Sequence, residues 1–154
     1  MGADIDHQHP DVSADVLNWG TWVLSQLGPG AAGFRFDAVK HIDRDFLSKF
    51  VKYVRKDRER LFGVGEFWKD SIGHLEAYLD AMGTQVCNDF PFGVRKFLCA
   101  DAQFFFLQFS VFDAPLHYNF KEAGDAGNTY DLRKIWDGTV VQRRPTDAVY
   151  VSWR

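Results

Sequence analysis

The spacing of apolar residues along the chain predicts three helices in its first half. Apolar side chains recur about every 3.6 residues over 10–27, up to a Gly-Pro-Gly sequence at 28–30. Similar stripes cover 43–55 and 72–82, and Gly83 ends the third. The apolar positions of the first two segments are Val12, Val16, Trp19, Val23 and Leu27, and then Phe46, Leu47, Phe50, Val51 and Val54.

Short segments typical of strands lie between and after these helices. Residues 33–37 alternate in polarity, 61–67 form a short apolar run, and 109–116 and 148–151 are further apolar runs. A short helix is expected at 130–136. The order is therefore helix, strand, helix, strand, helix, an insert, strand, helix, strand. Regular alternation of this kind predicts an α/β fold with parallel strands and crossover helices.

Two of the expected strands end in a carboxylate. Alternation places Arg35 and Asp37 on one face of the first strand, and Glu66 ends the second. Because neighbouring parallel strands lie about 4.8 Å apart, the two carboxyl groups are expected to face each other across about 5 Å, the separation that retaining glycosidases use. Taken singly, each carboxylate is better explained as the cap of the following helix or as the partner of a nearby base, and it is the pair in successive units that favours a site.

Composition and charge exclude several classes of protein. The net charge of −3 provides no electrostatic footprint for nucleic acid or an anionic membrane, and no apolar run is long enough to span a bilayer. No early apolar run is typical of a signal peptide. The two cysteines, Cys87 and Cys99, provide no disulfide framework, so an intracellular protein is expected. Aromatic residues, 16% of the chain, serve either a bulky core or sugar stacking.

Two long motifs resemble conserved regions of the α-amylase family of glycoside hydrolases, family 13. GFRFDAVKH at 33–41 resembles its second region, and GVGEFW at 63–68 resembles its third. Surrounding stretches at 3–12, 109–120 and 130–141 are similar to liquefying-type α-amylases. The resemblance implies an incomplete (β/α)₈ barrel, roughly strands 4 to 7 with their helices. It also implies a retaining hydrolase of internal α-1,4-glucosidic bonds in starch-type or glycogen-type polymers and maltooligosaccharides, monomeric in its full-length parent.

Several positions match functional residues of this family. Asp37 matches the nucleophile that forms the glycosyl-enzyme intermediate, and Glu66 matches the general acid/base. Arg35 matches the arginine that pairs with the nucleophile. Residues that line the sugar subsites are matched by Lys40, His41 and Trp68. A transglycosylase would share this machinery, and a non-catalytic glucan-binding protein or a non-functional relic is the alternative from a different class.

The resemblance also implies a calcium cofactor. Asp4 matches a calcium ligand, His41 contributes through its backbone carbonyl, and Asp6 matches a ligand of the adjoining metal site. Oxygen ligands of this kind suit calcium. Gln8 stands where many relatives carry another aspartate, which counts against the second site. Two other interpretations remain open: a solvated acidic loop that caps the helix, and an open metal site of Asp4, Asp6 and His41 serving another chemistry.

The chain departs from the family in two ways: it has an insert at 86–108, and it lacks one of the catalytic carboxylates. The third catalytic carboxylate belongs to an Asn-His-Asp motif that these 154 residues do not contain. We therefore interpret 1–154 as a partial catalytic barrel domain that is nearly inactive and prone to aggregate by itself. Codons for 86–108 and 151–154 are compatible with splice signals. Removal of 86–108 would join Gln85 to Phe109 and restore a continuous sequence that resembles the family. We hypothesise that both segments are translated introns.

Overall fold

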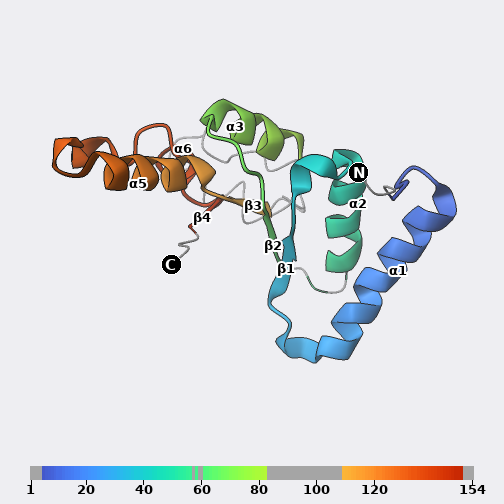
Figure 1. The fold of residues 1–154 in the computed structure, drawn as a ribbon. Helices are drawn as coiled ribbons and strands as arrows, with labels where there is room; N and C mark the ends of the chain where they lie inside the picture. Colours follow the sequence, from blue (N-terminus) through green and yellow to red (C-terminus); the bar gives the residue numbers. More distant parts are fainter. Residues whose placement is uncertain (1–4, 57, 59–60, 83–108, 151–154) are drawn as a thin grey trace, which may run out of the picture.

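A computed structural model describes residues 5–56, 58, 61–82 and 109–150. Its sheet has four parallel strands in the order β1-β2-β3-β4 (Figure 1). Arg35 is in register with Val64, and Val64 with Ser110, so these three residues lie on one face. The strands are β1 (Gly33–Phe36), β2 (Phe62–Gly65), β3 (Phe109–Phe112) and β4 (Ala148–Val149).

The helices that follow the strands agree with a parallel α/β fold. The core cluster joins residues of α1, α2, α3 and α6 to the sheet face that carries Val111, and α1 lies beside α2 (Figure 1). This arrangement confirms the α/β class and is compatible with part of a (β/α)₈ barrel. Which barrel strands these are stays a prediction. The α-helices are α1 (Pro10–Leu27), α2 (Arg44–Arg55), α3 (Ile72–Ala81), α5 (Ala114–Ala126) and α6 (Val140–Arg143).

The helix-facing side of the sheet is built from phenylalanines and glycines. The rings of Phe34 and Phe36 meet Phe50 of α2 edge to face, at centroid distances of 5.7 and 5.8 Å. Phe109 of β3 lies over β2 because Gly65 has no side chain. A Cβ at Gly65 would lie 2.8 Å from the Cζ of Phe109, too close for any other residue without a shift of that ring. Phe34 and Phe36 therefore face the helices, on the side of β1 opposite Arg35.

Helix α1 has the predicted limits but buries a different face from its apolar stripe. Trp19 and Leu27 of that stripe are 54% and 63% exposed. The buried positions are offset from it, because Gly20 admits the ring of Phe50 from α2. A Cβ at Gly20 would lie 2.6 Å from the Cζ of Phe50. Close approach at a small residue thus decides the packing face. The buried residues of α1 are Ser13, Leu17, Gly20 and Leu24.

The strand predicted at 109–116 is wrong in its second half. The strand ends at Phe112, and Asp113 caps α5 by accepting a hydrogen bond from the Leu116 amide at 3.1 Å. An all-apolar run does not separate a buried strand from a buried helix start by periodicity alone. The short helix predicted at 130–136 is only a 3₁₀ turn, Leu132–Lys134, and the main helix after β3 is α5.

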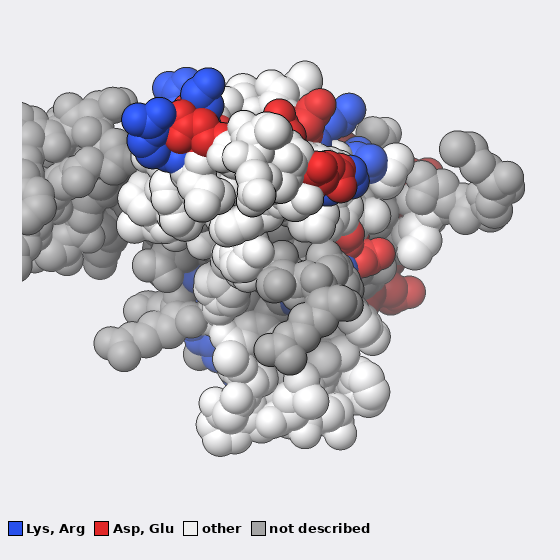
Figure 2. Space-filling view, turned by 60° about the vertical axis from the view of Figure 1, so that its left-hand side comes forward, with Lys and Arg blue, Asp and Glu red and all other residues white. Residues whose placement is uncertain are grey.

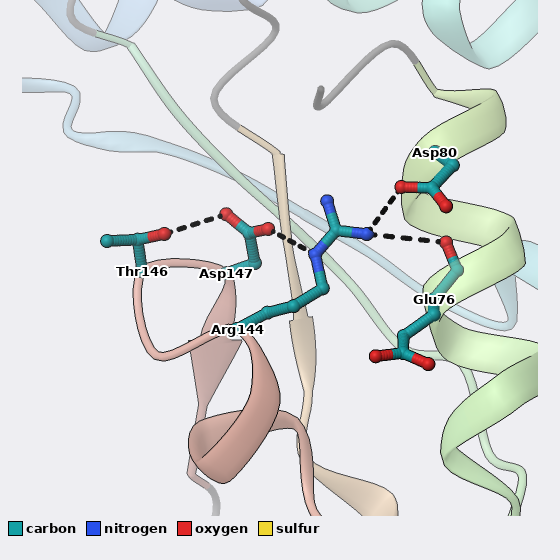
Figure 3. Close-up of polar contacts among 5 residues, drawn as sticks. All are labelled: Glu76, Asp80, Arg144, Thr146 and Asp147. Atoms are coloured by element: carbon teal, nitrogen blue, oxygen red, sulfur yellow. Dashed lines mark hydrogen bonds and ion pairs between the residues drawn. The ribbon is translucent and has the colours of Figure 1, made fainter. Parts of the chain in front are cut away.

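A buried arginine fixes the loop between α6 and β4 onto α3 (Figure 3). Arg144 is 4% exposed, and its guanidinium pairs with Asp80 at 2.6 Å and with Asp147 at 2.8 Å. It also donates to the backbone carbonyl of Glu76 at 3.4 Å. Because Asp80 and Glu76 lie on α3, this one side chain joins segments that are 64 and 68 residues apart. It therefore holds β4 at the edge of the sheet.

The surface combines mixed charges with exposed aromatic side chains. One face shows acidic and basic groups side by side along its upper edge, with a broad uncharged area below (Figure 2). Trp19, Trp22, Phe62 and Trp136 are 58% to 44% exposed. In the part of the chain that the structure describes, no helix is both long and apolar enough to cross a bilayer. The segments 86–108 and 151–154, hypothesised as introns, lie outside the described residues.

Candidate functional site

The candidate site lies where β1 and β2 end, and backbone hydrogen bonds hold the two ends together. The Glu66 amide donates to the Phe36 carbonyl at 2.8 Å, and the Val39 amide donates to the Glu66 carbonyl at 3.1 Å. Ala38 adopts the left-handed conformation, with φ of 45°, so the chain turns sharply just after Asp37. Asp37 and Glu66 therefore leave neighbouring parallel strands at the same edge of the sheet, as expected from two successive strands that each end in a carboxylate.

One guanidinium group bridges the two carboxylates. Arg35 binds Asp37 through Nη1 at 2.8 Å and Glu66 through Nη2 at 2.7 Å. The Arg35 and Asp37 side chains are 46% and 72% exposed, whereas Glu66 is 14% exposed. Arg35 also lies over the ring of Phe112 on β3, with 5.8 Å between its Cζ and the ring centroid. The result is one open carboxylate, one sheltered carboxylate, and a cation shared between them.

The sheltered carboxylate has a second donor, the indole of Trp68. Its Nε1–H donates to Oε1 of Glu66, while Arg35 occupies Oε2. The indole packs edge-on against His117 and Tyr118 from the first turns of α5, at ring-centroid distances of 5.3 and 6.4 Å. The sequence did not single out His117 or Tyr118. Their position on an aromatic cluster could have been found only by recognising that Asp113 starts a helix.

The structure does not bring Lys40 and His41 into this cluster. Both belong to the 3₁₀ turn η2 (Val39–His41) and are exposed. Within residues 5–56, 58, 61–82 and 109–150, no side-chain hydrogen bond or ion pair joins either residue to Arg35 or Glu66. They lie on the turn that follows Asp37, so a role for them at the site remains a prediction.

The described residues do not assemble a calcium site. Asp6 uses its Oδ1 to accept the Gln8 amide at 3.0 Å, which makes it the cap of a local turn. Asp4 lies outside the described residues. Among the residues that the structure covers, no three His, Cys, Asp or Glu side chains form a group that could hold a metal ion. The described residues therefore do not fit a calcium ion by themselves, and the calcium site and the open metal site, which both include Asp4, remain predictions.

A third strand-end carboxylate, Asp113, is a structural group. It is 3% exposed and follows β3. Its two oxygens accept backbone hydrogen bonds from Leu116 at 3.1 Å and from Val141 at 2.8 Å. Asp113 thus anchors the starts of both α5 and α6. Because both oxygens are already engaged, Asp113 is not a free acid facing the site.

The fold and the site define a class: a parallel α/β protein with paired carboxylates at adjacent strand ends, as in barrel hydrolases. No protein-family model matches the chain. It is 40% identical over 150 residues to a glucan 1,4-α-maltohexaosidase of Bacillus sp. (strain 707), covering 97% of this chain and 24% of that protein. The identity and both coverages are the same for an α-amylase of Bacillus licheniformis.

A more distant relative widens the comparison. The cytoplasmic α-amylase of Escherichia coli (strain K12) is 31% identical over 150 residues, covering 97% of this chain and 25% of that protein. The chain therefore spans about a quarter of the length of the curated relatives it matches. The similarity extends over nearly all of the chain. The chain therefore belongs to the α-amylase family of glycoside hydrolases, family 13, as a segment of such a protein.

Proposed function

We propose that this chain provides part of the catalytic site of a retaining α-1,4-glucan hydrolase, with Asp37 as nucleophile and Glu66 as general acid/base. The observation that carries the proposal is the bridge from Arg35 to both carboxylates at 2.8 and 2.7 Å. A shared cation keeps two acidic groups close together at one strand edge, which double displacement at a sugar carbon requires. The different exposure of the two carboxylates supports different roles for them.

The proposed chemistry proceeds in two balanced steps. An Asp37 oxygen attacks the anomeric carbon, the glycosidic C–O bond breaks, and its electron pair goes to the leaving oxygen, which takes the proton of Glu66. In the second step Glu66 removes a proton from water, the water oxygen attacks the same carbon, and the bond to Asp37 breaks. Glu66 thereby regains its proton, and the anomeric configuration is retained.

The remaining assignments support binding. Trp68 is partly buried beside Glu66 and offers a flat surface to a sugar ring, and Lys40 and His41 lie on the turn after Asp37. A starch-type or glycogen-type polymer, or a maltooligosaccharide, is the proposed substrate. Calcium binding through Asp4, Asp6 and His41 also belongs to the proposal, and it requires ligands beyond the described residues.

The test places the chain in a complete barrel. In the first chimera all 154 residues replace the matching segment of the Bacillus licheniformis relative, and a second chimera omits 86–108. We expect at least one chimera to hydrolyse maltoheptaose, and Asp37→Asn and Glu66→Gln to lower its kcat by several orders of magnitude. Asp125→Asn, on the exposed end of α5, is the matched control and should leave kcat unchanged.

The outcomes separate the alternatives. Two inactive chimeras, or an active one that tolerates Asp37→Asn and Glu66→Gln, refute the proposal. Binding of maltoheptaose without turnover would support the glucan-binding alternative. The 154-residue chain by itself is expected to be nearly inactive, because it contains no Asn-His-Asp sequence to supply the third carboxylate. If 86–108 is a translated intron, only the second chimera is active, and genomic codons must carry the splice signals.

A further inference from the structure

Both oxygens of Glu66 are held by groups that can only donate hydrogen bonds. The Trp68 indole donates to Oε1, and the Arg35 guanidinium donates to Oε2 at 2.7 Å. Neither indole nitrogen nor guanidinium has a lone pair with which to accept. Protonation of Glu66 must therefore weaken one of these two contacts, because the new O–H cannot point at a donor and a carboxyl hydroxyl oxygen accepts a hydrogen bond less well than the carbonyl oxygen. The protein's structure decides which contact is weakened.

The two donors differ in how firmly they are placed. Arg35 is 46% exposed and keeps its other ion pair, to Asp37 at 2.8 Å, if it leaves Glu66. Trp68 is packed against the rings of His117 and Tyr118 at 5.3 and 6.4 Å, and those two rings are 5.7 Å from each other. Moving the indole would disturb its two ring contacts, whereas moving Arg35 exchanges one exposed hydrogen bond for water and shifts a cation over the ring of Phe112. The Trp68 contact is therefore the one that persists.

We propose that Trp68 is a positioning residue that selects the oxygen of Glu66 from which the acid proton is delivered. Its N–H stays on Oε1, so the proton resides on Oε2, on the side of the carboxyl that Arg35 shares with Asp37. His117 and Tyr118 hold the indole in place for this role. The inference rests on the proposed function. It gives Trp68 a second role besides sugar stacking, and in this second role Trp68 acts through Glu66.

The test uses the maltoheptaose-active chimera and separates proton delivery from sugar binding. Trp68→Phe keeps a flat ring and removes the N–H. Its kcat on maltoheptaose, whose leaving group needs a proton, is expected to fall about tenfold or more, with KM within about twofold. Its kcat on 2-chloro-4-nitrophenyl maltotrioside, whose leaving group departs without protonation, is expected to stay within about threefold. Trp22→Phe, at a tryptophan on α1 that is 58% exposed, is the matched control.

A second variant keeps the test valid if Trp68→Phe folds poorly. Tyr118→Leu leaves the indole N–H in place and removes one ring that holds it. We expect its kcat on maltoheptaose to fall less than that of Trp68→Phe, and its kcat on the aryl substrate to change little. Equal losses on both substrates, or a rise in KM alone, would show that Trp68 only binds sugar and would overturn the inference. If Glu66→Gln itself retains activity on maltoheptaose, the proposed function fails first, and the inference fails with it.

Discussion

Replacement of Arg35 by lysine tests the central contact of the site. The guanidinium reaches Asp37 and Glu66 through two different nitrogens, at 2.8 and 2.7 Å. An ammonium group is a single point charge without this fork, so a lysine can satisfy one carboxylate at a time. Arg35→Lys therefore keeps the positive charge of the site while it removes the bridge. The substitution separates geometry from charge.

The size of the effect follows from the contact that is lost. A hydrogen bond to a charged group contributes about 1.5–3 kcal/mol when it is sheltered. The Asp37 side chain is 72% exposed, which places its contact with Arg35 at or below the lower end of that range. A loss of about 1–2 kcal/mol corresponds to a decrease in kcat/KM of about 5- to 30-fold. Arg35→Met removes both contacts and the charge, so its decrease should be at least about tenfold larger.

The assay is initial-rate hydrolysis of maltoheptaose by the active chimera, with kcat and KM measured separately. Arg133→Lys is the matched control, since Arg133 makes a similar fork to Asp131 at 2.8 Å on an exposed turn far along the chain. We expect the control to match the parent within about twofold. If Arg35→Lys equals the parent, or if it is as inactive as Arg35→Met, the bridge between the carboxylates is not what the site depends on.

Three further predictions concern stability, measured by urea unfolding of the same chimera. Gly33→Ala places a Cβ 2.0 Å from the backbone oxygen of Phe62, which cannot swing aside, so we expect a loss of about 2–4 kcal/mol; an unchanged midpoint would contradict the β1–β2 register. Arg144→Met leaves Asp147, 18% exposed, without its cation, and should cost about 2–4 kcal/mol; no change would mean that the ion pair is dispensable. Among the described residues the buried Tyr78 hydroxyl has no hydrogen-bond partner, so Tyr78→Phe should stay within about 1 kcal/mol of the parent at neutral pH. Burial raises the pKa of Tyr78, so the parent loses stability as pH rises above about 10, and the variant should lose less; identical pH profiles would argue against burial of this hydroxyl.

Local periodicity determined much of the fold from sequence alone. The limits of α1 and the buried stripe of α2 followed from the 3.6-residue repeat. The shared face of Arg35 and Asp37 followed from the two-residue repeat of a strand, and the ion pair between them agrees with it. These features depend on residues a few positions apart, so a pattern in the sequence is sufficient to predict them.

Contacts between distant segments were decided only by the tertiary structure. The apolar residues of α1 allowed more than one of its faces to be buried. The face that is buried depended on how closely α2 could approach Gly20. The bridge from Arg35 to Glu66 joins residues 31 positions apart, and the aromatic support of Trp68 comes from α5, whose start was hidden in an apolar run. Such contacts depend on the packing of whole elements, because the position of each side chain is set by neighbours that no local repeat encodes.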